Sequence, residues 1–161
     1  MELKTVKIDM PRDSQLVVGT SHFIKTTEDL AEAIACSVPG IKYGLAFCES
    51  SGPCLVRTEG NDEELREAAG KNGLELGAGH SFLIFLRGAY PINILNAVKA
   101  VPEVCTIHCA TANPIEIVVA ETDQGRAILG VVDGFHSKGV ETTRDIEERR
   151  GFLRKMGYKL K

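Results

Sequence analysis

Residues 81–86 read Ser-Phe-Leu-Ile-Phe-Leu, and this nearly continuous apolar run decides the fold. A run of this kind is typical of a central strand that is buried on both faces. A helix is predicted soon after it, because Pro91 suits the first turn of a helix that runs to Ala100. The sequence therefore predicts a sheet with helices packed on it.

The rest of the chain mixes strand and helix patterns. Thr27 and Asn61 are expected to cap two helices, and Asn72-Gly73 is expected to end the second of them. A hairpin turn is predicted at residues 122–125, so at least one strand pair is antiparallel. Further strands are expected at 2–9, 15–22, 43–48, 54–57, 104–109, 115–121 and 127–132. The two capped helices are expected at 28–37 and 62–71, and another helix at 143–158. We predict an α/β fold of the α+β type, in which residues 1–161 form one domain with a mixed, partly antiparallel sheet.

Composition excludes several classes of protein. The formal net charge is −3, which argues against binding of nucleic acid through a basic surface. No segment approaches the ~20 apolar residues that span a bilayer. No apolar segment follows the charged start, so we expect no signal peptide, no membrane partner and a cytoplasmic location. Five cysteines without a C-x-x-C pair argue against a disulfide framework or a zinc site.

The glycine-flanked histidine at residues 77–81, Gly-Ala-Gly-His-Ser, is the main candidate for chemistry. Gly77 and Gly79 allow close approach of a ligand to the backbone, and the amides up to Ser81 are arranged in sequence as an anion nest requires. At the mouth of such a nest, neutral His80 is a nucleophile for a phosphoryl group. The alternative is a plain turn between helix and strand with a half-buried histidine.

Three further strand ends carry polar residues that a ligand site needs. Thr111 and Asn113 offer hydroxyl and amide groups to a ribose or a base edge. Glu49 is a candidate general base, or a group that orients a histidine. Asp133 suits ribose hydroxyls or Mg²⁺. Each of these segments also reads as an ordinary turn, and that alternative stays open.

Standard nucleotide motifs are missing from the chain. There is no P-loop, no G-x-G-x-x-G after a strand and no protein-kinase signature. Arg57, Arg87 and Arg126 lie at strand ends or beside the hairpin turn, where each is a candidate cation or an ordinary surface residue. Any phosphate site in this protein is therefore unconventional.

Taken together, the separated motifs resemble the adenosine-specific kinase family, a small family of archaeal and bacterial proteins. The segments that carry the resemblance are 47–49, 52–57, 77–82, 90–93, 109–114 and 130–134, so it covers nearly the whole chain. It implies binding of adenosine and AMP rather than ADP or ATP, a stable phosphohistidine at His80, and a homo-oligomer that is a trimer or a hexamer.

The resemblance leaves two functions open. One is a phosphotransferase that acts through phosphorylated His80, with Mg²⁺ accompanying a phosphoryl donor and no other cofactor expected. The other is a non-catalytic oligomer that senses adenosine or AMP. In both, Gly77, Gly79, Ser81, Glu49, Thr111, Asn113 and Asp133 are the expected ligand-binding residues.

Overall fold

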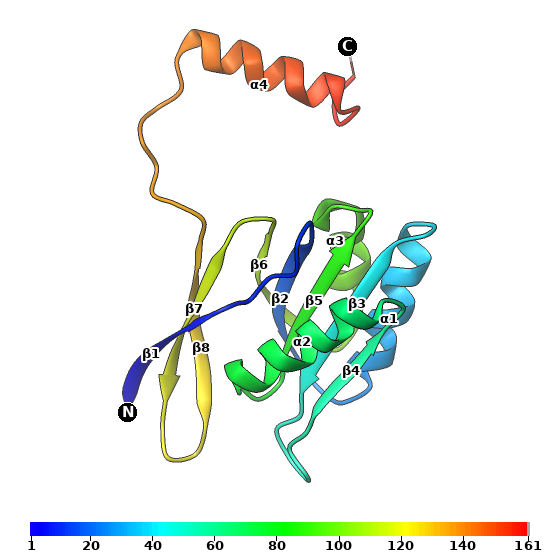
Figure 1. The fold of residues 1–161 in the computed structure, drawn as a ribbon, viewed down its shortest axis with the longest axis vertical. Helices are drawn as coiled ribbons and strands as arrows, with labels where there is room; N and C mark the ends of the chain where they lie inside the picture. Colours follow the sequence, from blue (N-terminus) through cyan, green and yellow to red (C-terminus); the bar gives the residue numbers. More distant parts are fainter. Residues whose placement is uncertain (161) are drawn as a thin grey trace.

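The computed structural model describes residues 1–160 and contains eight strands and four helices in that part of the chain (Figure 1). They follow the order β1 (Glu2–Lys7), β2 (Gln15–Ser21), α1 (Thr26–Ser37), β3 (Lys42–Cys48), β4 (Val56–Gly60), α2 (Glu63–Leu76), β5 (Ser81–Arg87), α3 (Pro91–Ala100), β6 (Val104–Thr111), β7 (Ile115–Glu121), β8 (Arg126–Asp133) and α4 (Thr143–Lys155). The expected α+β class is confirmed.

The strands form two sheets, and all pairs of named strands are antiparallel. The larger sheet has the order β4-β3-β5-β2-β6, and the smaller has the order β1-β7-β8. Strand β5 lies at the centre of the larger sheet, and residues 81–86 are all buried, as the apolar run predicts. The expected hairpin at 122–125 joins β7 to β8.

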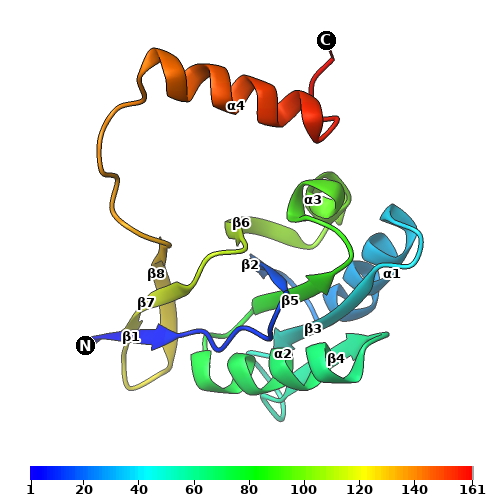
Figure 2. The ribbon, with the colours of Figure 1, turned by 45° about the horizontal axis from the view of Figure 1, so that its top comes forward.

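Two apolar layers cover the larger sheet, one on each face. Figure 2 shows α1 and α3 on one side of this sheet and α2 on the other. On one face, Val17, Leu45 and Ile84 pack with α1 and α3. On the other face, Val18 and Leu83 pack with α2 and with the inner side of the three-stranded sheet. Helix α2 approaches β3 closely at Gly44, where a Cβ atom would lie 2.1 Å from the backbone nitrogen of Arg66.

Some predicted boundaries are wrong. Helix α2 is capped by Asp62, whose side chain accepts a hydrogen bond from the amide of Leu65, and not by Asn61. It continues past the predicted stop, because the buried Asn72 donates to Ala68 and exchanges hydrogen bonds with the backbone of Asp9. The helix ends before Gly77 rather than Gly73. Two other predictions also fail: α1 begins at Thr26 rather than after a Thr27 cap, and β4 covers 56–60 rather than 54–57.

Residues 134–161 are the C-terminal arm of the sequence, and its described part, residues 134–160, extends away from the rest of the molecule. An extended segment follows β8 and leads to α4, which lies away from both sheets (Figures 1 and 2). None of residues 134–160 is buried, and Phe135, Val140 and Phe152 are 86%, 94% and 59% exposed. The arm therefore lacks the packing contacts that usually stabilise a helix. Without such contacts, a helix of 13 residues is only marginally stable in water.

Candidate functional site

The backbone holds His80 at the beginning of β5 between two other strands. Gly77 ends α2 in the left-handed region, at φ 57°, and His80 itself has φ 61°. The His80 amide donates to the carbonyl of Cys48 at 2.7 Å, and the His80 carbonyl accepts from the amide of Ser21 at 2.9 Å. The histidine is therefore fixed to β3 on one side and to β2 on the other.

The His80 ring is half-buried and lies against two other rings. It stacks on Phe47 with a centroid separation of 5.8 Å and an interplanar angle of 21°. The ring of His22 meets it edge-on at 6.2 Å. Two imidazoles thus lie side by side at one end of the large sheet. No sequence motif surrounds His22, and only the pairing of β2 with β5 places it beside His80.

The loop amides near His80 are mostly occupied. The amide of Gly77 donates to Gly73 and that of Ser81 to Ala78, so with His80 three amides of the expected nest are already paired. Buried Ser81 also uses its hydroxyl on the Ala78 carbonyl, at 2.6 Å. These groups shape the loop and are not free to bind an anion in this conformation.

Glu49 binds a cation and not a histidine. Both of its carboxylate oxygens accept from Nη2 of Arg57, at 3.2 and 3.1 Å, and one also accepts from the amide of Leu55. The Leu55 amide and the Arg57 guanidinium hold the pKa of Glu49 below its ordinary value. Glu49 therefore stays ionised and orients Arg57, which lies next to Phe47 across β3 and β4.

Four polar atoms at this end of the molecule are buried without a hydrogen-bond partner among residues 1–160. They are the hydroxyl oxygens of Ser21 and Thr27, Nε of Arg57 and Oε2 of Glu103. Buried polar groups in native proteins are nearly always paired, so a cluster of exceptions indicates that something else satisfies them. Sequence patterns carry no signal for such atoms.

Thr111, Asn113 and Asp133 come together, but away from His80. Oδ1 of Asp133 accepts from the Thr111 hydroxyl at 2.7 Å and from the Asn113 amide group at 3.1 Å. Thr111 pairs with Leu16, whereas His80 lies beside Ser21 at the other end of β2. Five residues of strand separate the two places by about 16 Å. A ligand-binding role for these three residues stays a prediction, and within one chain they do not join the His80 site.

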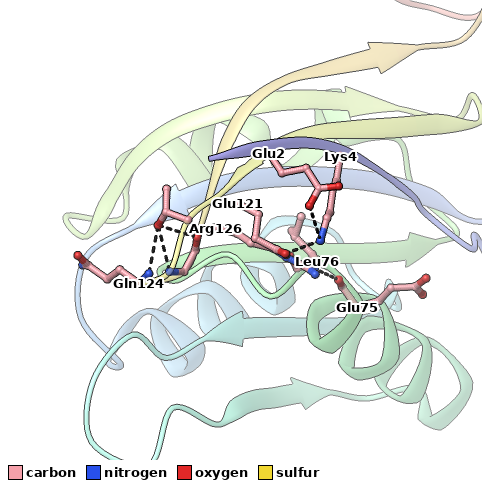
Figure 3. Close-up of polar contacts among 9 residues, drawn as sticks. Glu2, Lys4, Glu75, Leu76, Glu121, Gln124 and Arg126 are labelled. Carbon is pink, nitrogen blue, oxygen red and sulfur yellow. Dashed lines mark hydrogen bonds and ion pairs between the residues drawn. The ribbon is translucent and has the colours of Figure 1, made fainter.

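A cavity of about 800 Å³ lies beside the histidine loop. Gly77, Gly79 and Glu49 line it together with the β7–β8 turn. Figure 3 shows how Arg126 holds this turn against α2: Nη1 donates to the carbonyls of Glu75 and Leu76, and Nε donates to Glu121. Arg126 is therefore a structural link between the small sheet and the loop that carries His80.

Replacing Arg126 with alanine is expected to lower the free energy of unfolding by about 2 kcal/mol, because several polar groups lose their partner. Urea denaturation measures the change. Arg144→Ala is the matched control, since Arg144 forms only an exposed ion pair with Glu148 and its loss should change stability by about 0.5 kcal/mol or less. Equal effects of the two substitutions would contradict the linking role of Arg126.

No three His, Cys, Asp or Glu side chains of residues 1–160 lie close enough together to hold a metal ion. No helix in the same range is both long enough and apolar enough to cross a bilayer.

The fold and the site define a small antiparallel α+β protein with a fixed, half-buried histidine beside unpaired polar groups. Its family is clear: the chain belongs to the adenosine-specific kinases, whose family model matches residues 6–159. It is also similar to the PH1918 protein from Pyrococcus horikoshii OT3, known from a crystal structure, with 43% identity over 99% of both chains and a TM-score of 0.95. A search of curated proteins found no match.

Proposed function

We propose that this protein binds adenosine and AMP and transfers a phosphoryl group from His80 to adenosine. Membership of a family described as adenosine-specific kinases supports an adenosine kinase-like function. The observation that carries the finer proposal is the fixed His80 ring, which is stacked on Phe47 and accompanied by a second imidazole. A nucleophile in a set orientation lowers the entropic cost of reaction.

Once His80 is phosphorylated, transfer of the phosphoryl group to adenosine needs no further reactant. The N–P bond of phosphohistidine breaks, and a P–O bond forms to the 5′-hydroxyl of adenosine, which gives AMP. The hydroxyl proton ends on the imidazole, so the histidine returns to its neutral form. Arg57 lies on the strand next to Phe47 and supplies a positive charge near this place, held in position by Glu49.

Intact-mass spectrometry of freshly prepared protein tests the phosphohistidine. We expect a phosphoryl-sized adduct on the wild type that is lost in acid and is missing from His80→Asn. Asparagine is a suitable replacement because it tolerates the left-handed backbone of this position. An adduct that persists in His80→Asn would remove His80 from the proposal.

The second candidate function is a non-catalytic sensor of adenosine or AMP. Two observations favour it: the chain has no recognised motif for a nucleotide donor, and His80 is not among the residues that line the cavity of about 800 Å³. In that case adenosine raises the melting temperature, since a ligand of the native state stabilises it, while no AMP is formed from adenosine and phosphorylated protein.

We also propose that the protein is a homo-oligomer, of the trimer or hexamer size that the family resemblance implies, assembled through its C-terminal arm. The arm carries eight Lys and Arg residues against four Asp and Glu residues, whereas residues 1–133 carry eleven against eighteen. A basic arm with exposed apolar side chains therefore complements the acidic body of a second copy. This partner would give α4 the packing surface that its own chain does not provide.

A further inference from the structure

We propose that the cavity between the beginning of α1 and β4 is the nucleoside site, with the base against Phe23 and the polar groups against Thr27 and Arg57. The inference rests on the proposed function, because it assigns a place to the adenosine of that proposal. The cavity measures about 620 Å³, which is within the usual range for small-molecule sites. Nucleosides are small enough to fit such a volume.

The cavity lies next to the histidine site. Phe23 follows His22 directly, and the rings of these two residues are 6.1 Å apart. On the other side, Arg57 lines the cavity and pairs across the strands with Phe47, on which His80 stacks. A nucleoside in this cavity is thus flanked by neighbours of both imidazoles.

Two of the unpaired buried atoms belong to the lining of this cavity. Thr27 is only 7% exposed, yet its hydroxyl has no partner, and Nε of Arg57 is also unpaired. Leaving such groups buried and unpaired costs free energy, which a polar ligand recovers by hydrogen bonding to them. In the larger cavity, by contrast, the charged groups of Glu49 and Arg126 already have protein partners.

Phe23 has the features of a stacking surface. Phe23 is 53% exposed, and its φ of 78° is a strained value for a residue other than glycine. Strain of this kind persists mainly at functional sites. Aromatic rings bind nucleobases by stacking on their faces. The strained backbone therefore presents a flat apolar surface at the edge of the cavity.

Charges around the cavity are balanced, so the cavity does not favour a polyphosphate. Lys25 and Arg57 are balanced by Glu28 and Glu59 among the lining residues. Lys25 is further paired with Asp29 and Glu103, so its charge is already neutralised. Such a lining offers both donors and acceptors to the hydroxyls and ring nitrogens of a nucleoside, without the excess positive charge that a polyphosphate requires.

Adjacent threonines provide the first test, read by calorimetric titration with adenosine. Thr27→Val removes the unpaired hydroxyl, so we expect an unchanged or higher melting temperature without ligand and a three- to tenfold weaker binding of adenosine, roughly the loss of one hydrogen bond. Thr26→Val is the control, because the Thr26 hydroxyl already donates to the carbonyl of His22 at 3.2 Å. That variant should lower the melting temperature and leave the affinity of the folded protein unchanged.

Phe23→Ala provides the second test and does not depend on a buried position. We expect about tenfold weaker binding of adenosine, the loss of one stacking contact. Leu74→Ala, at the larger cavity, should bind like the wild type. If Leu74→Ala weakens binding while Phe23→Ala and Thr27→Val do not, the inference is overturned and the proposed function survives. If the wild type does not bind adenosine at all, both fall together.

Discussion

Removal of residues 137–161 is expected to convert the proposed homo-oligomer into monomers of unchanged fold. The apolar core draws all of its residues from positions 6 to 131, so the body keeps its packing without the arm. Gly134, whose amide bonds to the carbonyl of Pro114, is retained in the shortened chain. Light scattering coupled to size-exclusion chromatography gives the mass, and circular dichroism reports the fold.

A point variant of the full chain serves as the matched test. Phe152→Asp places a charge on the exposed face of α4 at a residue that is 59% exposed in the single chain. If α4 packs against a second copy, this change also dissociates the oligomer, because burial of an unpaired charge is costly. An unaltered number of subunits for both the shortened chain and Phe152→Asp would contradict assembly through the arm.

Gly44→Ala is expected to destabilise the protein by more than about 4 kcal/mol, an exceptional effect for one methyl group. The added Cβ would meet backbone atoms of Leu65 and Arg66 at 2.2 and 2.1 Å. Backbone atoms of a packed helix cannot turn aside as a flexible side chain does, so α2 would have to move away from β3. Since α2 ends at the loop that carries His80, the site should be lost with the packing.

Urea denaturation of Gly44→Ala, compared with Gly125→Ala, tests this close approach. Gly125 lies in the β7–β8 turn with open space around its Cβ position, so alanine there should change stability by about 0.5 kcal/mol or less. If Gly44→Ala unfolds at the same urea concentration as the wild type, the backbone of α2 does not approach Gly44 of β3 this closely.

Much of the fold follows from local patterns in the chain. The apolar run at 81–86 predicts the central strand because burial on both faces removes polar residues. Prediction fails where tertiary contacts override a local signal. Asn72-Gly73 reads as a helix end, yet the contacts of Asn72 with Asp9 keep the helix continuous to Leu76. The separation into two sheets likewise depends on which strands meet, and periodicity does not encode that.

The candidate site could be predicted only in part, for a topological reason. His80 is recognisable because glycines precede it, but Ser21 and His22 join it through the pairing of β2 with β5. Thr111 ends β6, and polar residues near strand ends suggested a shared pocket. Strands β5 and β6 both pair antiparallel with β2 and therefore run in the same direction, but His80 precedes β5 whereas Thr111 is the last residue of β6. Thr111 therefore lies at the edge opposite His80.

Transfer of a phosphoryl group from His80 to adenosine is tested most directly in a single turnover. The protein is phosphorylated on histidine with phosphoramidate, freed of excess reagent and mixed with adenosine, and AMP and protein-bound phosphate are followed together. We predict that the wild type and His22→Gln form AMP as their acid-labile phosphate disappears, whereas His80→Asn forms none. Bound adenosine that leaves the wild-type phosphate intact, or AMP formation by His80→Asn at the wild-type rate, would contradict the account.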